Sequence, residues 1–297
     1  MKKVAYALVY GLVYLVGMLP FGLLYLLSDI NAFLLYHLIR YRRKVVRENL
    51  LKSFPDKDLS EIKRIEKRNY RNLCDLFAET CKLLVLKPKQ LQKRVTFLNP
   101  ELMEDLYKKG KSVFTVLPHS GNWEWHGKLM HTVSLHKASA IYKRVENEVF
   151  ERLMKKIRES YGIEHEHMIE SRVAFRELLK RSDMLNSILI IADQSPRGVE
   201  SDYWNTFLNQ ETCWFTGTEK MARKLDYAVV FVAMRRVKRG YYEVQFKTIC
   251  EDANNLPENY IMEQYSQETE RFVNENPDNW LWTHRRWKHK RHNKVAE

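Results

Sequence analysis

The chain has 297 residues, 45% of them hydrophobic, which is enough for one large α/β domain or two small domains with a sizeable core. Its 50 Lys and Arg residues outnumber its 37 Asp and Glu residues by 13, so the expected partner is anionic: nucleic acid, an anionic membrane surface, a phosphorylated lipid or an acidic carrier protein. The four cysteines form no C-x-x-C pair, which speaks against a zinc site or a disulfide framework and fits a reducing cytoplasmic setting.

An uncharged run of 24 residues from Val4 to Leu27 opens the chain. It is long enough to cross the roughly 30 Å hydrocarbon core of a membrane, so we expect a membrane-associated helix. The run is longer than the apolar part of a signal peptide, and no A-x-A-like cleavage site follows it. Because Gly11, Gly17 and Pro20 interrupt the run, an interfacial or re-entrant helix and a buried helical hairpin stay open as alternatives.

A basic cluster follows this run and exceeds the two lysines before it. Its members are Arg40, Arg42, Arg43, Lys44 and Arg47. If the run spans the membrane, the positive-inside rule places the remainder of the chain in the cytoplasm.

Beyond the basic cluster, segments with the hydrophobic pattern of a helix alternate with short apolar segments typical of strands. The first segment, 59–86, has the spacing of one long amphipathic helix. Further helices are expected at 101–109, 123–135, 146–161, 171–181 and 217–226, and strands at 112–117, 138–142, 187–192, 228–234 and 241–249. This alternation predicts an α/β fold in which helices cover a sheet, with ligands at the carboxyl ends of the strands. His119 and Asp193 both fall at such ends.

The stretch from Pro118 to Trp125 carries the most chemistry-bearing residues. His119 and Glu124 are five positions apart, which in a regular helix turns the side chain by about 500°, so the two would not share a face. The pair therefore makes sense in a turn between a strand and a helix. There a neutral imidazole is suited to take a proton from a hydroxyl, with a carboxylate on its other nitrogen, and the amides of Gly121 and Asn122 are placed to face an oxyanion. A histidine that merely packs or lies on the surface is the alternative.

The string H-S-G-N-W-E resembles the H-x4-D/E signature of the lysophospholipid and glycerolipid acyltransferase superfamily, in particular its late acyltransferases of lipid A biosynthesis, of the lauroyl and myristoyl type. Three further segments are similar to that branch, in the same order along the chain. They are Tyr142-Lys143-Arg144 with Asn147, Ala192-Asp193-Gln194, and the ending from Trp280 to Lys288, which contains W-x-H-R-R-W-K.

The resemblance implies a single acyltransferase domain with a mixed sheet flanked by helices, over residues 41–297, after an N-terminal membrane-associated segment at 1–40. It implies an O-acyltransferase that moves a fatty acyl chain from acyl carrier protein, or from acyl-CoA, to a hydroxyl of a lipid A precursor. We expect no cofactor, no metal and no nucleic acid. The implied location is the bacterial inner membrane, with the catalytic domain on the cytoplasmic side.

The resemblance also assigns site residues. His119 is the expected general base, and Glu124 is expected to orient it. Candidates for holding the oxyanion or the acceptor are Gly121, Asn122, Lys143, Arg144, Arg158, Asp193 and Gln194. Candidates for contact with membrane or phosphate are Arg285, Arg286, Trp287 and Lys288.

The sequence leaves two alternatives open, a different acceptor lipid and a nucleic-acid-binding protein. The branch usually has Tyr-Arg-Pro where this chain has Tyr142-Lys143-Arg144, and lysine does not reproduce the bidentate fork of arginine, so a lysophospholipid, aminolipid or glycolipid acceptor stays open. The aromatic and basic ending, from Trp280 to Arg291, is also a pattern that nucleic-acid binders show.

Overall fold

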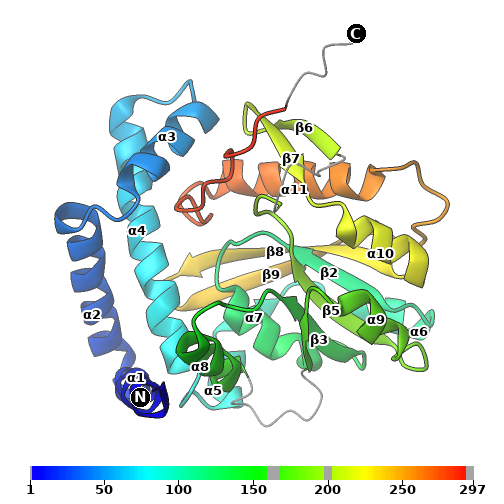
Figure 1. The fold of residues 1–297 in the computed structure, drawn as a ribbon, viewed down its shortest axis with the longest axis horizontal. Helices are drawn as coiled ribbons and strands as arrows, with labels where there is room; N and C mark the ends of the chain where they lie inside the picture. The colour runs from blue at the N-terminus through cyan, green and yellow to red at the C-terminus, as the bar shows by residue number, and fades with distance from the viewer. Residues whose placement is uncertain (1, 159–166, 197–202, 292–297) are drawn as a thin grey trace.

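The computed structural model describes residues 2–158, 167–196 and 203–291, and in them a seven-stranded sheet forms the centre of the molecule (Figure 1). Its strand order is β1-β9-β8-β2-β5-β3-β4. The strands are β1 (Val95–Phe97), β2 (Val113–Leu117), β3 (Lys137–Tyr142), β4 (His167–Glu170), β5 (Asn186–Ile191), β8 (Ala228–Lys238) and β9 (Tyr241–Cys250). Because β9 runs antiparallel to β8 while β2, β3, β4, β5 and β8 run parallel, the sheet is mixed, as the sequence predicts.

Strand β2 lies in the middle of the sheet, and all five of its residues are buried. Successive side chains of a strand point to opposite faces. Accordingly Phe114 and Val116 belong to one apolar core, and Val113 and Leu117 belong to a second core on the other face. A strand buried on both faces reads as a continuous apolar run, which is why its sequence identifies it so clearly.

Helices cover both faces of the sheet (Figure 1). The core containing Phe114 also takes residues from α9 (Ala174–Leu179), α10 (Gly217–Leu225) and α11 (Tyr260–Glu275). The core containing Val113 takes residues from α6 (Glu101–Lys108), α7 (Trp123–Leu129) and α8 (Glu148–Arg158). A short hairpin of β6 (Tyr203–Phe207) and β7 (Gln210–Trp214) stands apart from the main sheet.

The N-terminal segment forms two helices rather than the single one expected from 4–27. These are α1 (Lys2–Met18) and α2 (Phe21–Phe33), which is prolonged by a π-helical turn at Leu34–Leu38. Pro20 lies between the two helices, and its missing N–H and fixed φ separate them. By length and composition, the stretch Phe21–Leu38 is apolar enough to cross a membrane.

The helix expected at 59–86 is α4 (Leu59–Lys82), which begins where the Asp58 side chain accepts hydrogen bonds from Ser60 N and Glu61 N. It packs against α1 and α2 on one side. Its buried Glu66 pairs with Arg43 and Arg47 of α3 (Arg43–Ser53), so two of the basic residues after the N-terminal run are engaged inside the protein.

Several element boundaries differ from those expected. The segment 123–135 divides into α7 and a 3-10 turn at Met130–Thr132, while 146–161 and 171–181 shorten to α8 and α9, with 159–161 outside the described residues. The sequence reading missed α3, α11 and the short elements α5 (Pro88–Gln92), β1, β4, β6 and β7. The short elements among these have three to five residues, which is too few to show a helical or strand period of hydrophobic side chains.

Candidate active site

His119 is held by Asp193 at the carboxyl ends of two adjacent parallel strands. The register pairs Leu117, the last residue of β2, with Ile191, the last of β5, so the residues two positions further on meet above the sheet edge. The Nδ1 atom of His119 lies 2.5 Å from Oδ1 of Asp193, and the backbone N–H of His119 donates to Oδ2 at 2.8 Å. Trp280 Nε1 also donates to Oδ2, at 2.6 Å.

The Asp193 carboxylate is buried yet ionised. Burial alone would raise its pKa, but the neighbouring His119 and the hydrogen bonds from His119 and Trp280 outweigh burial and hold the pKa below its usual value. Because an ionised carboxylate only accepts hydrogen bonds, the proton between the two side chains belongs to Nδ1 of His119. The other ring nitrogen, Nε2, is then the acceptor, and Nε2 of Gln194 lies 3.3 Å from it.

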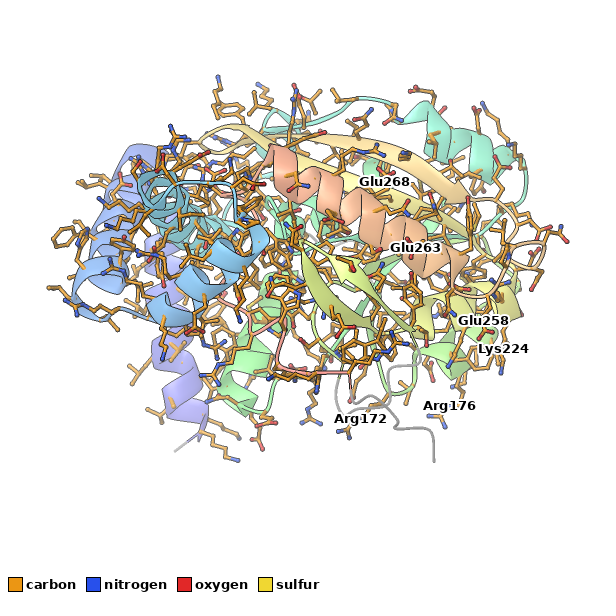
Figure 2. The ribbon with its side chains drawn as sticks, turned by 90° about the horizontal axis from the view of Figure 1, so that it is seen from above. Arg172, Arg176, Lys224, Glu258, Glu263 and Glu268 are labelled. Carbon is orange, nitrogen blue, oxygen red and sulfur yellow. The ribbon has the colours of Figure 1, made fainter. Side chains whose placement is uncertain are left out.

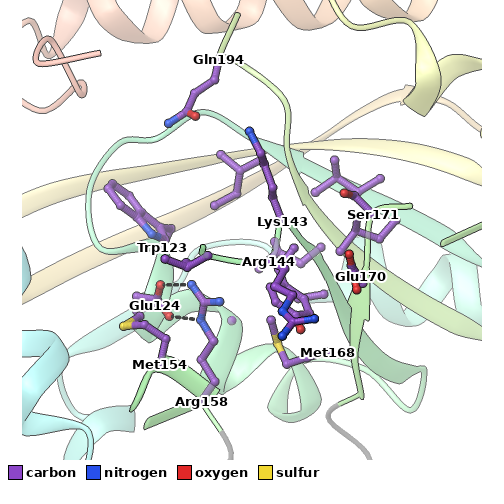
Figure 3. A pocket seen from close by; sticks show the side chains of 18 of the residues that line it. Trp123, Glu124, Lys143, Arg144, Met154, Arg158, Met168, Glu170, Ser171 and Gln194 are labelled. Atoms are coloured by element: carbon purple, nitrogen blue, oxygen red, sulfur yellow. Dashed lines mark hydrogen bonds and ion pairs between the residues drawn. The ribbon is translucent and has the colours of Figure 1, made fainter. Parts of the chain in front are cut away.

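The expected pairing of His119 with Glu124 is wrong, because the carboxylate on His119 is that of Asp193. Glu124 instead accepts two hydrogen bonds from Arg158, from Nη2 at 2.6 Å and from Nε at 2.9 Å (Figure 3). The helix that starts at Trp123 places Glu124 in its first turn, where the end of α8 brings Arg158. Burial alone would lower the pKa of Arg158, but the hydrogen bonds and charge of Glu124 raise it above its ordinary value.

A tight turn between β2 and α7 presents His119. Gly121 has φ of +61°, and a Cβ there would lie 2.5 Å from the carbonyl oxygen of Met234, so only glycine fits. Asn122 caps α7 by accepting from Trp125 N at 3.0 Å, and its Nδ2 donates to Glu79 of α4 at 2.6 Å. The turn is thereby fixed from both sides. The role of the Gly121 and Asn122 amides toward an oxyanion stays a prediction.

His119 lines a cavity of about 940 Å³ whose wall is partly apolar and partly charged (Figure 3). The predicted site residues that share this wall are His119, Glu124, Lys143, Arg144, Arg158 and Gln194. Apolar side chains of the same wall include Met130, Ala138, Ala140, Met154, Met168 and Leu189. A cavity of this kind suits a ligand with a long apolar part and an anionic part. Within the described ranges no three His, Cys, Asp or Glu side chains come together as a metal site requires.

The tryptophans and Arg286 of the C-terminal ending pack inside the protein. Arg286 is only 1% exposed, so its expected contact with membrane or phosphate is wrong. Its Nη2 donates to the carbonyl oxygen of Cys213 at 2.7 Å, and its guanidinium lies 4.5 Å from the centre of the Trp214 ring. Trp287 is also turned inward and donates to Oγ1 of Thr212 at 2.7 Å. Because Trp280 and Trp282 are buried and Trp287 is turned inward, the tryptophans of this ending form no exposed surface on which nucleic-acid bases would stack.

Arg285 and Lys288 are exposed, and their contact with membrane or phosphate stays a prediction.

Two residues of this ending support the site, and the sequence reading did not single them out. Trp280 holds Asp193, as described above. His284 accepts a hydrogen bond at Nε2 from the backbone N–H of Ser195, at 3.2 Å, and so fastens the loop that carries Asp193 and Gln194. Burial lowers the pKa of His284 to about 4, which keeps the ring neutral and able to accept. The only sequence signal for either residue was the motif in which they stand.

A family model described as bacterial lipid A biosynthesis acyltransferase matches residues 1–289. The match covers all the helices and strands described above, including the turn with His119 and the ending with Trp280. No curated protein matches the chain.

Proposed function

Because the chain belongs to the bacterial lipid A biosynthesis acyltransferase family, and is therefore an acyltransferase with a lipid A-type substrate, we propose that it moves a fatty acyl chain from an acyl thioester to a hydroxyl of a lipid A precursor. The observation that carries the proposal is the contact of His119 with the buried Asp193 at the wall of a large, partly apolar cavity. The acceptor hydroxyl meets Nε2 of His119, and the acyl chain lies along the apolar wall.

In the proposed reaction His119 is the general base and Asp193 is a positioning residue. Nε2 of His119 takes the hydroxyl proton as the acceptor oxygen forms its bond to the thioester carbonyl carbon. The tetrahedral intermediate then collapses, the C–S bond breaks, and the leaving thiolate takes the proton back from His119. Asp193 stabilises the imidazolium between these steps, and no acyl-enzyme is needed. Gln194 gives up its contact with Nε2 when the hydroxyl arrives.

In the proposed reaction, cationic residues of the cavity wall bind the oxyanion and the phosphate of the acceptor. Glu124 fixes the plane of the Arg158 guanidinium against the cavity, and this preorganised cation stabilises the developing oxyanion together with the amides of Gly121 and Asn122. Lys143 and Arg144, which follow β3 and are exposed at the cavity wall, bind the phosphate of the acceptor.

The N-terminal helices attach the enzyme to the bacterial inner membrane, with the catalytic body on the cytoplasmic side. The family is typically membrane-associated, and α1 and α2 leave large apolar side chains exposed. The most exposed of them are Val4, Leu8, Leu12, Leu15, Met18, Leu26 and Phe33. Such a face is costly in water and favourable at a lipid surface, where the acceptor also lies.

The donor in this proposal is acyl carrier protein, with acyl-CoA as the alternative, and no cofactor takes part. Direct transfer needs only a base, an oxyanion site and two bound substrates, and the cavity wall offers residues for each of these parts.

Mass spectrometry of the lipid product tests the proposal. The detergent-solubilised protein and its His119→Ala variant are incubated with acyl carrier protein thioesters and with a tetra-acyl lipid A precursor, lysophosphatidic acid or lyso-aminolipids as acceptor. We expect one acyl mass added to the lipid A precursor by the wild type, and a loss of about 10²–10⁴ in rate for the variant. Transfer only to another acceptor would refute the lipid A assignment, and transfer by the variant at the wild-type rate would refute the base.

A further inference from the structure

Three exposed cations without a described ion pair lie along one edge of the molecule (Figure 2). Arg172 precedes α9, Arg176 lies within α9, and Lys224 lies in the last turn of α10. Neighbouring cations on the same helices do have carboxylate partners: Lys180 pairs with Glu177, and Arg223 pairs with Glu219. Among the described residues, Arg172, Arg176 and Lys224 form no ion pair, although Glu177 lies near Arg176 and Glu258 lies near Lys224 (Figure 2), so all three cations are accessible to a partner outside the molecule.

Aromatic side chains accompany these cations. Phe175 is 36% exposed, and the Nζ atom of Lys224 lies 5.6 Å from the centre of its ring. We call Arg172, Phe175, Arg176 and Lys224 the basic patch. Exposed aromatic and arginine side chains side by side are enriched in protein–protein interfaces, whereas isolated lysines are depleted there.

The basic patch adjoins the rim of the active-site cavity. Arg172 lines the cavity, as does Phe215, which is 55% exposed and lies two residues before α10. A macromolecule bound to the basic patch therefore lies beside the wall of the cavity that His119 also lines. The bound partner and the cavity are close enough to serve one reaction.

The position of the basic patch distinguishes an aqueous partner from a membrane. The exposed apolar helices α1 and α2 lie at one end of the molecule, while α9 and α10 lie at the opposite end (Figure 1), and the turned view in Figure 2 keeps the same separation. When α1 and α2 contact a bilayer, the basic patch faces the aqueous phase. An anionic protein in solution fits this geometry better than a lipid surface.

We propose that the basic patch is the docking site of the acyl carrier protein, an acidic protein that carries the acyl chain as a thioester on a flexible arm. This inference rests on the proposed function, in which that thioester is the donor. The carrier binds Arg176 and Lys224 with carboxylates and Phe175 with an apolar side chain, and its arm enters the cavity past Arg172. The acceptor lipid binds Lys143 and Arg144 and reaches His119 separately from the carrier.

The test compares two charge-reversal variants of equal net charge. Arg176→Glu with Lys224→Glu changes the basic patch without touching a residue of the cavity wall. Lys108→Glu with Lys109→Glu is the matched control, because both lysines are exposed at the end of α6, which leads into the amino end of β2. Each variant is assayed for binding of fluorescently labelled acyl carrier protein at low and high salt, and for KM and kcat with acyl carrier protein thioester and with acyl-pantetheine, an uncharged donor without a carrier.

We expect the patch variant to bind the carrier about tenfold or more weakly at low salt, with KM for the carrier thioester raised to match and kcat little changed. Its kinetics with acyl-pantetheine should equal those of the wild type, which also shows that the variant folds. The control should bind and turn over like the wild type.

Carrier binding equal in the wild type, the patch variant and the control would overturn the inference while leaving the proposed function intact. Loss of binding to anionic vesicles by the patch variant, with carrier binding unchanged, would also overturn the inference, because the basic patch would then contact lipid. Absence of transfer by the wild type with both donors would refute the proposed function, and the direct binding measurement would still decide whether the basic patch holds the carrier.

Discussion

Asp193 receives three hydrogen bonds in a buried setting, from two nitrogens of His119 and from Trp280. A buried carboxylate without such partners would take up a proton, and an uncharged Asp193 would not hold the Nδ1–H tautomer of His119. Trp280 therefore acts on the site through Asp193, although it belongs to a segment almost ninety residues further along the chain.

Glu124 and Arg158 form a single functional pair in this account. Replacing Glu124 by Gln or Arg158 by Gln should each lower kcat/KM by a similar factor, about tenfold or more, because either change releases the guanidinium from its fixed position. The double variant should be no worse than the more damaged single variant. Steady-state kinetics of the four proteins checks this. Losses that multiply would contradict the pairing.

His284 makes stability depend on pH. Its pKa in the folded state is about 4, below the ordinary value of 6.5, because burial disfavours the charged ring. The unfolded chain therefore binds a proton near pH 6.5 while the native state does not, so this residue lowers the free energy of unfolding as pH falls from about 6.5 to about 4. His284→Gln keeps an acceptor for Ser195 N–H without titrating. Urea denaturation should show a shallower decline for this variant, and equal slopes would refute the assignment.

The sequence identified His119 because a buried strand and a glycine turn point to it. It did not identify the partner of His119, because spacing along the chain reports only local neighbours. Asp193 lies 74 residues away and reaches His119 through the pairing of β2 with β5. His119 and Asp193 each lie two residues beyond the end of their strand. Their contact therefore follows once β2 and β5 are known to be neighbours in the sheet. The sequence predicts Arg286 at the surface, because charge alone does not show that a side chain is buried.

At the scale of elements, α4 connects the N-terminal helices to the active-site turn. The buried Glu79 accepts hydrogen bonds from Tyr25 of α2 at 2.9 Å, from Asn122 at 2.6 Å and from Tyr242 of β9 at 2.7 Å. Burial raises the pKa of Glu79 even though these donors and Arg236 oppose the shift. The geometry of the turn thus depends on a helix that contributes no residue to the reaction.

Glu79→Ala should lower the free energy of unfolding by about 3–5 kcal/mol, because it leaves two buried donors, on Asn122 and Tyr242, and the half-buried Tyr25 hydroxyl without an acceptor. It should also lower kcat, since Asn122 is no longer held. Glu79→Gln retains one acceptor oxygen and should cost less. Chemical denaturation measures both variants, with the exposed Glu48→Ala as a control expected within about 0.5 kcal/mol of the wild type. A Glu79→Ala protein as stable as that control would contradict the role of α4.

The sequence predicts most of the long elements and few of the short ones, and the exceptions among the long elements are α3 and α11. Strand β2 is recognisable as a continuous apolar run because it is buried on both faces, and helix α4 has a clear helical period because one of its faces is buried. The segments β4 and β6 are four and five residues long, too short to show a hydrophobic period, and β4 forms only by pairing with β3, about thirty residues earlier in the chain. The N-terminal run was expected as one helix because hydropathy is uniform across it, although Pro20 marks the break.

At the scale of the whole molecule, helices α1 and α2, with their exposed apolar side chains, lie at the opposite end from α9 and α10 (Figure 1). The wall of the cavity with His119 includes residues of α8, which packs against α1, and Arg172, which lies next to α9. The net charge of +13 favours both an anionic membrane and an acidic carrier.

Membrane binding through α1 is testable with Leu8→Asp and Leu12→Asp combined. These leucines are 70% and 64% exposed and lie one helical turn apart. Their loss should weaken binding to vesicles by about 3 kcal/mol, roughly a hundredfold in partitioning. Leu135→Asp, at an 81% exposed leucine outside the N-terminal helices, is the control and should bind normally. Vesicle flotation measures both, and equal binding would contradict a membrane role for α1.

The most direct measurement of the central claim is kcat for four proteins: the wild type, His119→Ala, Asp193→Asn and the double variant, assayed with acyl carrier protein thioester and a tetra-acyl lipid A precursor. If His119 is the base and Asp193 positions it, His119→Ala should lose about 10²–10⁴, Asp193→Asn should lose about 10² or more, and the double variant should be no slower than His119→Ala alone. An Asp193→Asn enzyme within a few-fold of the wild type, or losses that multiply in the double variant, would contradict the account.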